Sequence, residues 1–358
     1  MRYDPFARGG HPVGVRTASV QDDARGRTLP VEIWYPADDA HAGDDLREET
    51  RDRFHVFPAL PPSAQDAVRD AAARPGRFPL VLFSHGFGGH RRQSTFLCTH
   101  LASHGYLVAA MDHVGNTTQD VLGSLMALPG GGPAPDPVAL LAAATDYRPS
   151  DVSLVLDRLL DGSAGDLAAR IDSERVGMAG HSFGGWTTLA VSGRDPRVRA
   201  ALALAPAGGA PAAEGDPLPG LLDLAWEREV PTLLVVAERD SLLPLAGMRA
   251  LFARVRSQRR LAVLANADHQ HFCDQVEQTH ELMRSLALLA PPALRERMPQ
   301  LPPIGELCPG LHGHLATRGL GLAHLDAHLR EIEAAAQLLS DGASALARHG
   351  VAIEIEAP

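Results

Sequence analysis

The chain contains no lysine, so all 33 of its basic side chains are arginines. They are outnumbered by 43 acidic residues, which gives a formal net charge of −10 at pH 7. An acidic protein repels nucleic acids and anionic membranes, so we expect neither as a partner. The most basic run, ARVRSQRR at residues 253–260, is more simply interpreted as the solvated end of a helix.

Long hydrophobic runs and cysteines are also scarce. Apolar runs such as PLVLF, YLVAAM and TLLVVA have the length of a β-strand and are far shorter than a membrane span. The opening MRYDPFARGG lacks the apolar core of a signal peptide, so we expect a cytoplasmic protein. Cys98, Cys273 and Cys308 show no zinc-binding spacing and fit a reducing compartment, although a Cys273–Cys308 bridge is left open for an exported protein.

From Phe78 onward, short apolar runs alternate with segments of helix length. Runs such as PLVLF, RVGMAG and TLLVVA lack polar–apolar alternation, which is typical of parallel strands buried on both faces. Before them, VGVRTASV and LPVEIWYP predict an antiparallel hairpin around DDARGRT. The sequence therefore predicts an α/β fold with a mostly parallel sheet, an N-terminal antiparallel hairpin and helices on both faces.

Several segments interrupt this pattern. We expect one domain, residues 1–358, with insertions at about 37–77, 115–149 and 207–225 and a C-terminal helical extension at about 290–358. The first insertion is polar and includes a short helical patch at SAQDAVRDAAA (63–73). The other two are rich in Gly, Pro and Ala, as lid-like loops are. The extension holds a predicted helix through LGLAHLDAHLREIEAAAQLL and a final short run, VAIEIEA.

The strongest chemical signal is RVGMAGHSFGGW at residues 175–186, which contains a G-x-S-x-G motif centred on Ser182. The motif lies between an apolar strand and an apolar helix, which is the context that it requires. The glycines allow a sharp strand-to-helix turn, so Ser182 is expected to be exposed and strained at the N-terminus of the helix. Ser182 is therefore the predicted nucleophile.

A serine nucleophile needs donors for the oxyanion, and FSHGFGGHRR at residues 83–92 offers them. This glycine-rich turn follows the first predicted parallel strand. We expect the backbone N–H of Phe87 to pair with that of Phe183 as the oxyanion hole.

The nucleophile also needs an acid and a base. Asp240 follows the strand TLLVVA just past its carboxyl end, where open α/β sheets place their sites, while Glu238 is nearer to the strand and is the alternative acid. LAVLANADHQH supplies the base, either His269 or His271. We favour His269 because it is the first histidine past the sheet edge. In an extended loop His271 would point the same way and flank the pocket.

The motifs FSHGFGG, LASHGYLVAAMDH, GHSFGG and HQHF resemble those of α/β-hydrolases, in the branch that contains dienelactone hydrolases and plasma-type platelet-activating-factor acetylhydrolases. The resemblance covers roughly residues 12–290. It implies the α/β-hydrolase fold and these roles: nucleophile Ser182, oxyanion donors Phe87 and Phe183, and base His269. The acetylhydrolases carry their acid after the strand that matches ALALAP, where this chain has Ala205. This departure moves the acid role to Asp240, the position used by dienelactone hydrolases and most of the superfamily.

Other residues are weaker candidates. We expect His271, His113 and Trp186 to be the substrate-binding residues, although His113 and Trp186 are more simply explained as structural. His324 and His328 have the i, i+4 spacing of zinc ligands, but no third ligand or H-E-x-x-H motif accompanies them. We therefore expect no metal ion and no organic cofactor.

These residues together predict a serine hydrolase that cleaves carboxylic esters through an acyl-enzyme, with a small-molecule ester as substrate. Amide, thioester and lactone substrates use the same machinery, and the sequence does not separate them. Two alternatives belong to other classes: a catalytically silent protein of this fold that acts as a binding module, and a metallohydrolase that uses the H-x-H and H-x-x-x-H pairs. A homodimer is left open.

Overall fold

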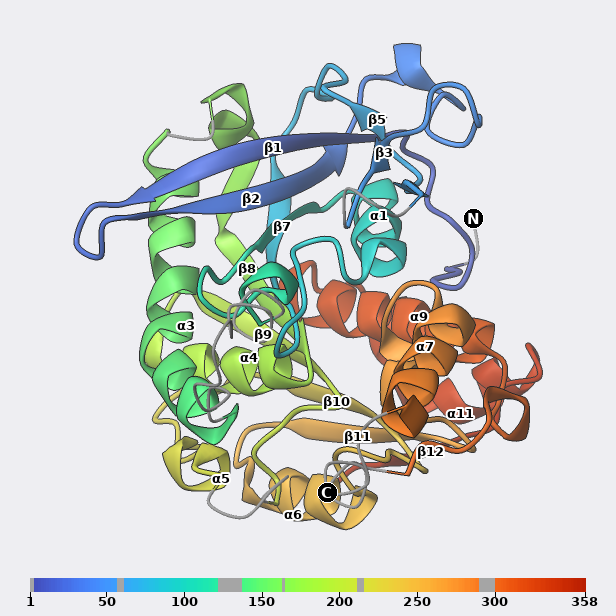
Figure 1. Ribbon diagram of the computed structural model, residues 1–358. Coiled ribbons are helices and arrows are strands. Elements are labelled where there is room, and N and C mark those ends of the chain that lie inside the picture. Colours follow the sequence, from blue (N-terminus) through green and yellow to red (C-terminus); the bar gives the residue numbers. More distant parts are fainter. Residues whose placement is uncertain (1–2, 57–60, 122–136, 163–164, 211–215, 290–299) are drawn as a thin grey trace.

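The computed structural model describes residues 3–56, 61–121, 137–162, 165–210, 216–289 and 300–358. Within them, ten strands form one sheet, and six adjacent strands, from β7 to β11, run parallel (Figure 1). In spatial order the strands are β12 (Ile353–Glu356), β11 (Arg259–Leu264), β10 (Thr232–Ala237), β9 (Val198–Leu204), β8 (Ile171–His181), β6 (Phe78–Ser84), β7 (Leu107–Met111), β2 (Arg27–Pro36), β1 (Val13–Asp22) and β5 (Val68–Arg69). The predicted fold class is confirmed.

Both faces of the parallel strands are buried, which explains their uninterrupted apolar sequences. In β10, Leu233 and Val235 belong to one hydrophobic cluster, while Leu234 and Val236 belong to another. Successive side chains of a strand point to opposite faces of the sheet, so each face receives every second residue. A strand covered on both sides therefore favours apolar residues at nearly every position.

Two helical layers cover the sheet. One face packs against α1 (Thr95–Ser103), α9 (Gly310–Leu329), α10 (Glu333–Ser340) and α11 (Gly342–Ala347). The other packs against α3 (Pro137–Leu160), α4 (Phe183–Arg194) and α6 (Leu245–Arg254). In Figure 1, α3 and α4, in green, stand on one side and α9, in red, on the other. The remaining helices are α5 (Leu218–Leu221) and α7 (Val276–Leu289).

The N-terminal hairpin is confirmed, but the insertion after it differs from the prediction. Strands β1 and β2 pair without interruption from Val13 opposite Pro36 to Asp22 opposite Arg27. Residues 63–73 form no helix; they contain β4 (Ser63–Ala64), which pairs with β3 (Arg53–Phe54), and β5, which extends the main sheet. The buried Gln65 amide accepts from Trp34 and donates to Asp52, both at 2.7 Å. These tertiary bonds outweigh the local helix propensity.

The expected lid at 115–149 is corrected in part. Helix α3 begins at Pro137, inside the segment that was expected to be a lid-like loop. The run VALLAAA has high helix propensity, and it continues into the apolar segment beyond Pro149 that packs on the sheet. Residues 122–136 of this segment, and 211–215 of the segment 207–225, lie outside the described residues.

The predicted C-terminal helix is divided in two. Glu331 has a positive φ of 55°, and the carbonyl of Asp326 accepts from the N–H groups of both Arg330 and Ile332, which ends α9 before α10 begins. The final run forms β12, antiparallel to β11, with Glu354 and Glu356 paired to Arg249. All three cysteines are free thiols, so the Cys273–Cys308 bridge is absent.

Strand β8 turns into α4 where the helix passes very close to β6. A methyl group on Gly184 would lie 1.9 Å from the carbonyl oxygen of Ser84, and one on Gly180 would lie 2.3 Å from the carbonyl oxygen of Gly184. Backbone atoms occupy the space of any side chain, so only glycine fits at these two positions.

We expect Gly184→Ala to lower the free energy of unfolding by about 1–3 kcal/mol or more, because the methyl group must push α4 away from β6. Gly220→Ala is the matched control, since a methyl group there meets no described atom within 4 Å. Urea unfolding followed by circular dichroism measures both. Equal midpoints for the two variants would contradict the close approach.

Candidate active site

The parallel strands bring the predicted residues to one edge of the sheet. The ends of four neighbouring strands are aligned, since His181 lies opposite Leu204, Leu204 opposite Val235, and Ala237 opposite Leu264. The residues that follow β8, β10 and β11 therefore lie at a common carboxyl edge, where open α/β sheets form their sites. They include the three predicted catalytic residues, Ser182, Asp240 and His269.

Ser182 lies in a strained turn between β8 and α4. Its φ of 58° and ψ of −119° are unfavourable for a residue with a side chain. Its N–H donates to the carbonyl of Leu204 at 2.8 Å, and its carbonyl accepts from the N–H groups of Trp186 and Ala207. Ser182 is partly exposed, while His181 and Phe183 beside it are buried. The fold thus holds one hydroxyl out of the core, at the positive end of a helix.

Asp240 and His269 form a buried pair. Nδ1 of His269 lies 2.8 Å from Oδ2 of Asp240, and the residues are 2% and 6% exposed respectively. The N–H groups of Leu242 and Leu243 donate to Oδ1 of the same carboxylate at 2.9 and 2.7 Å, which fixes its orientation. Burial alone would lower the pKa of His269, but the charge and hydrogen bond of Asp240 and the charge of Asp268 outweigh it and raise this pKa.

The other carboxylates near this loop have different partners. Glu238, the alternative acid, is exposed and accepts from the backbone N–H of Asn266 at 2.8 Å. Asp268 accepts from the N–H of His269 at 2.6 Å and from the N–H and Oγ of Ser241 at 2.7 Å, so it caps the 3₁₀ turn η3 (His269–Phe272). Asp240 is therefore the carboxylate that pairs with this imidazole.

The glycine-rich turn 85–89 lies beside Ser182. A methyl group on Gly86 would lie 3.4 Å from Cβ of Ser182, and the rings of Phe87 and Phe183 are 6.5 Å apart. Among the described residues, neither the N–H of Phe87 nor that of Phe183 donates to another group. Two free backbone donors thus flank the segment that carries the serine hydroxyl.

A chain of hydrogen bonds that the sequence analysis missed connects this turn to the histidine loop. The N–H of Gly86 donates to Oε1 of Gln93 at 3.0 Å, and Nε2 of Gln93 donates to Nδ1 of His181 at 2.8 Å. Nε2 of His181 then donates to the carbonyl of His269 at 3.1 Å. His181 is the variable residue of the G-x-S-x-G motif, but its partners are more than 80 positions away in the sequence. No local pattern identifies them.

His271, for which the sequence suggested a position flanking the pocket, binds backbone groups with both ring nitrogens. It is fully buried, its Nε2 donates to the carbonyl of Cys308 at 2.9 Å, and its Nδ1 accepts from the N–H of Asp268 at 3.0 Å. Burial lowers its pKa. Both ring nitrogens bind backbone groups because η3 turns the chain, whereas the expectation assumed an extended loop. His271 therefore anchors the loop to the backbone of the later segment at Cys308.

His113 and Trp186 are also buried, and their polar atoms bind other groups of the chain. His113 binds Ser84 through Nε2 and Asp151 through Nδ1, both at 2.9 Å, and burial holds its pKa well below the usual value. Trp186 packs in the cluster between α4 and α6, and its Nε1 donates to the carbonyl of Leu218 at 3.1 Å. Neither the histidine nor the tryptophan could be matched from sequence alone to the partners that occupy its polar atoms.

The zinc spacing of His324 and His328 has no further ligand in the structure. His324 is buried, and its Nε2 donates to the carbonyl of Pro231 at 3.2 Å. Across the described part of the chain, no three His, Cys, Asp or Glu side chains cluster closely enough to hold a metal ion. None of its helices is long and apolar enough to cross a membrane.

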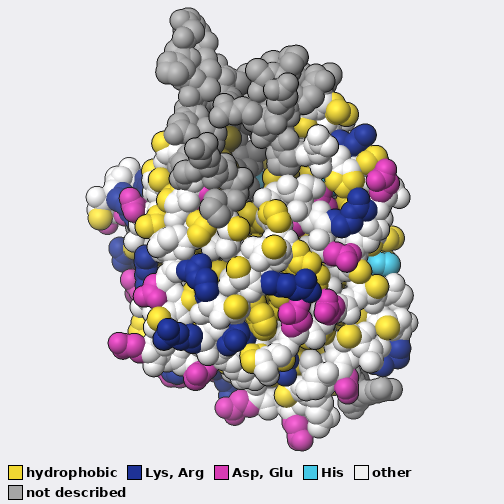
Figure 2. Space-filling model, turned by 90° about the horizontal axis from the view of Figure 1, so that it is seen from below, with side chains coloured by type: hydrophobic (Ala, Val, Ile, Leu, Met, Phe, Trp, Pro, Cys, Tyr) yellow, Lys and Arg dark blue, Asp and Glu magenta, His cyan; other side chains and the backbone are white. Residues whose placement is uncertain are grey.

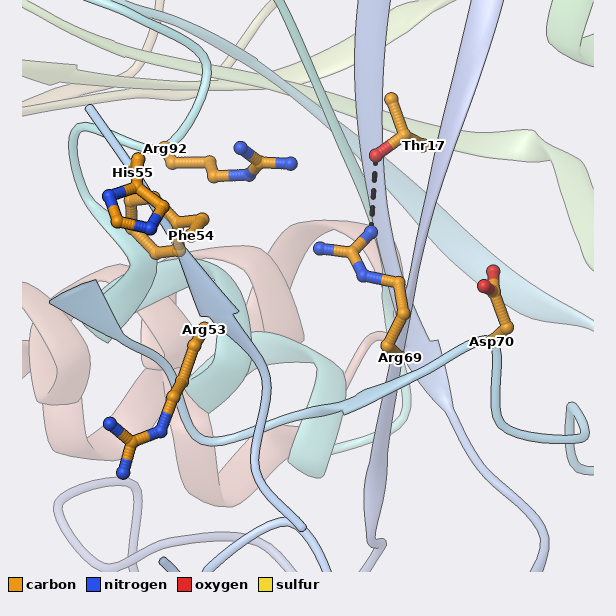
Figure 3. Close-up of a pocket in the computed structure, with 7 residues that line it drawn as sticks. All are labelled: Thr17, Arg53, Phe54, His55, Arg69, Asp70 and Arg92. Atoms are coloured by element: carbon orange, nitrogen blue, oxygen red, sulfur yellow. Dashed lines mark hydrogen bonds between the residues drawn. The ribbon is translucent and has the colours of Figure 1, made fainter. Parts of the chain in front are cut away.

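A polar depression of about 460 Å³ lies on another part of the surface (Figure 3). Its lining residues are Thr17, Arg53, Phe54, His55, Arg69, Asp70 and Arg92. Arg69 pairs with Glu32 and Asp52 at 2.7 Å, and Arg92 pairs with Glu32 at 2.9 Å and stacks over Phe54. These arginines are already neutralised by carboxylates. On the face shown in Figure 2, too, basic and acidic side chains are interspersed.

Two families match parts of the chain. The family described as platelet-activating factor acetylhydrolase, isoform II, matches residues 59–120. The family described as PET hydrolase-like matches residues 142–288, which include Ser182, Asp240 and His269.

The individual proteins that are similar to the chain include a cutinase and an acetylhydrolase. The chain is 26% identical to cutinase est1 of Thermobifida alba over 59% of this chain and 60% of that protein. It is 28% identical to a platelet-activating factor acetylhydrolase of Canis lupus familiaris over 36% of this chain and 35% of that protein. It thus spans between about a third and three fifths of the length of these curated relatives.

A solved structure covers nearly the whole chain. A ferulic acid esterase from Streptomyces cinnamoneus superposes with a TM-score of 0.64 and 26% identity, over 90% of this chain and 91% of that one. The parallel sheet, the serine turn after β8 and these matches together show that the chain is a member of the α/β-hydrolase superfamily.

Proposed function

We propose that this protein is a serine hydrolase that cleaves carboxylic esters, with Ser182 as nucleophile, His269 as base and Asp240 as the acid that orients it. The observation that carries the proposal is the buried Asp240–His269 pair, 2.8 Å apart, at the sheet edge where the strained Ser182 turn projects its hydroxyl. A carboxylate can only accept, so Nδ1 of His269 carries the proton and Nε2 keeps a lone pair.

In the first half of the reaction, Oγ of Ser182 attacks the acyl carbon while Nε2 of His269 accepts the hydroxyl proton. The carbonyl electrons move onto oxygen, and the N–H groups of Phe87 and Phe183 stabilise the oxyanion that forms. The intermediate then collapses, the ester C–O bond breaks, and the leaving alcohol takes the proton from Nε2. The acyl group remains on Ser182.

In the second half, His269 removes a proton from water, which attacks the acyl carbon. The new tetrahedral intermediate releases the carboxylic acid, and Ser182 recovers its proton from His269. Asp240 orients the ring and stabilises the imidazolium at each stage, because its two oxygens are held by His269 and by two backbone N–H groups.

For the substrate, we propose a small-molecule ester. Support comes from the names of the similar proteins, which are cutinases, a ferulic acid esterase and a platelet-activating factor acetylhydrolase. Amides, thioesters and lactones remain alternative substrates of the same residues, because the proposed steps need only an acyl carbon and a leaving group.

Ser182 is expected to react with a fluorophosphonate probe, because the strained turn leaves this residue partly exposed at the N-terminus of α4. Intact-mass and peptide analysis should find one adduct on the Ser182 peptide, and Ser182→Ala should lose both the adduct and the hydrolysis of p-nitrophenyl esters. Undiminished labelling or turnover in Ser182→Ala would overturn the proposed nucleophile.

The pH dependence of kcat/KM should identify the carboxylate that orients His269. The neutral form of His269 is the base, and its pKa is raised above the ordinary 6.5, so kcat/KM should fall as the pH drops through an inflection above 6.5. Asp240→Asn should lower kcat by about 10⁴-fold and shift this inflection to lower pH, since burial then dominates. Glu238→Gln is the matched control and should change neither. An inactive Glu238→Gln with an active Asp240→Asn would reassign the role.

Alanine variants of the two histidines in the loop should differ in turnover and in stability. His269→Ala should abolish turnover, because the base is removed. His271→Ala should keep measurable turnover but lower the free energy of unfolding by about 1–3 kcal/mol, because the N–H of Asp268 and the carbonyl of Cys308 lose a buried partner. Steady-state kinetics and thermal unfolding measure the two effects. The reverse kinetic pattern would give the base role to His271.

A further inference from the structure

Arg148 on α3 is a fully buried arginine close to the candidate active site. Burying a guanidinium group is costly unless its N–H groups find acceptors, so its partners indicate why it is there. The sequence analysis placed this residue in a lid-like loop and gave it no role.

The guanidinium group contacts both segments that carry the proposed oxyanion donors. Nη1 donates to the carbonyl of His85 at 2.6 Å, and Nη2 donates to the carbonyl of Gly86 at 3.0 Å. The same group lies over the ring of Phe183, 4.4 Å from its centroid. A single cation thus touches the turn before Phe87 and the side chain of Phe183.

The bond to Gly86 acts directly on the Phe87 N–H. These two groups belong to one peptide unit, and in a trans peptide the C=O and the N–H point in opposite directions. The Gly86 carbonyl accepts from Arg148, from the N–H of Gly89 at 3.1 Å and from Nδ1 of His85 at 2.7 Å. Three donors on the oxygen fix the direction of the Phe87 N–H and polarise it into a stronger donor.

We propose that Arg148 is a positioning residue of the oxyanion hole: it holds and polarises the Gly86–Phe87 peptide and places a positive charge behind both donors. This inference rests on the proposed function. The charge matters because the oxyanion exists only in the tetrahedral intermediates and their transition states, and electrostatic attraction is strong in a site shielded from water.

Arg148 retains its charge at neutral pH. Burial lowers its pKa to about 9, while the nearby Tyr147 and Asp151 act in the opposite direction. A neutral side chain of similar size at this position would keep much of the packing. It would lose the two carbonyl bonds, the bond to Oδ1 of Asn116 and the charge.

The experiment compares p-nitrophenyl acetate with O-(4-nitrophenyl) thionoacetate. Sulfur accepts hydrogen bonds poorly, so an oxyanion hole accelerates the oxoester more than the thionoester. Removal of one oxyanion donor costs about 10²–10³-fold in kcat, and mispositioning one should cost less. For Arg148→Met we expect kcat on the oxoester to fall by about 10–100-fold with KM little changed, and the oxoester-to-thionoester ratio of kcat/KM to fall by about tenfold.

The matched control is Arg27→Met. Arg27 also stacks on an aromatic ring, 4.8 Å from the centroid of Tyr147, and pairs with Asp151, but its other bonds go to Asp22 and the carbonyl of Val114. Its loss should destabilise the protein and leave the substrate ratio unchanged. A purely structural role of Arg148 would make the two variants alike.

Arg148→Lys covers the case in which Arg148→Met does not fold. It keeps the charge but cannot hold two carbonyls as a planar fork does, so the ratio should lie between those of wild type and Arg148→Met. An unchanged ratio in whichever Arg148 variant folds, with an active wild type, overturns this inference alone. A wild type that neither hydrolyses the oxoester nor reacts with the fluorophosphonate overturns the proposed function and this inference with it.

Discussion

The close approach of α4 to β6 is the constraint on which the site depends. Gly184 leaves no room for a side chain beside the Ser84 carbonyl, so the serine turn and the glycine-rich turn after β6 are pressed against each other. This contact brings the turn that carries Phe87 beside Ser182, and Ser182 itself has a strained backbone. The surrounding strands are buried on both faces of the sheet.

The sequence predicted the parts of this structure that depend on local pattern. Strand-length apolar runs located the parallel sheet, and the rule that sites follow strand ends selected Asp240 and His269 without knowledge of their separation. The sequence did not predict features that depend on partners far along the chain. Gln65 binds Trp34 and Asp52, which prevents a helix. His113 and His271 each use both ring nitrogens in hydrogen bonds to other groups of the chain. Arg148 had no signal, because the two carbonyls that it binds are more than 60 residues away.

The exclusive use of arginine has a structural counterpart. A guanidinium group is a planar fork with five donors, whereas an ammonium group is a point charge. Arg69 bonds to Thr17, Glu32 and Asp52 at once, and Arg148 bridges two successive carbonyls. Each of these arginines connects segments that the chain order keeps apart. In this protein the cations act as internal cross-links as much as surface charges.

The anchoring of His271 also sets the order in which the nascent protein becomes complete. The loop that carries His269 rests on the later segment through the Cys308 carbonyl, 37 residues downstream. At a synthesis rate of about 5–20 residues per second, the ribosome makes this support roughly 2–8 seconds after the loop itself. The strands that precede the Ser182 and Asp240 turns can pair during that interval, while the His269 loop still lacks this contact. The loop therefore gains its support from the C-terminal segment later than the strands gain theirs from one another.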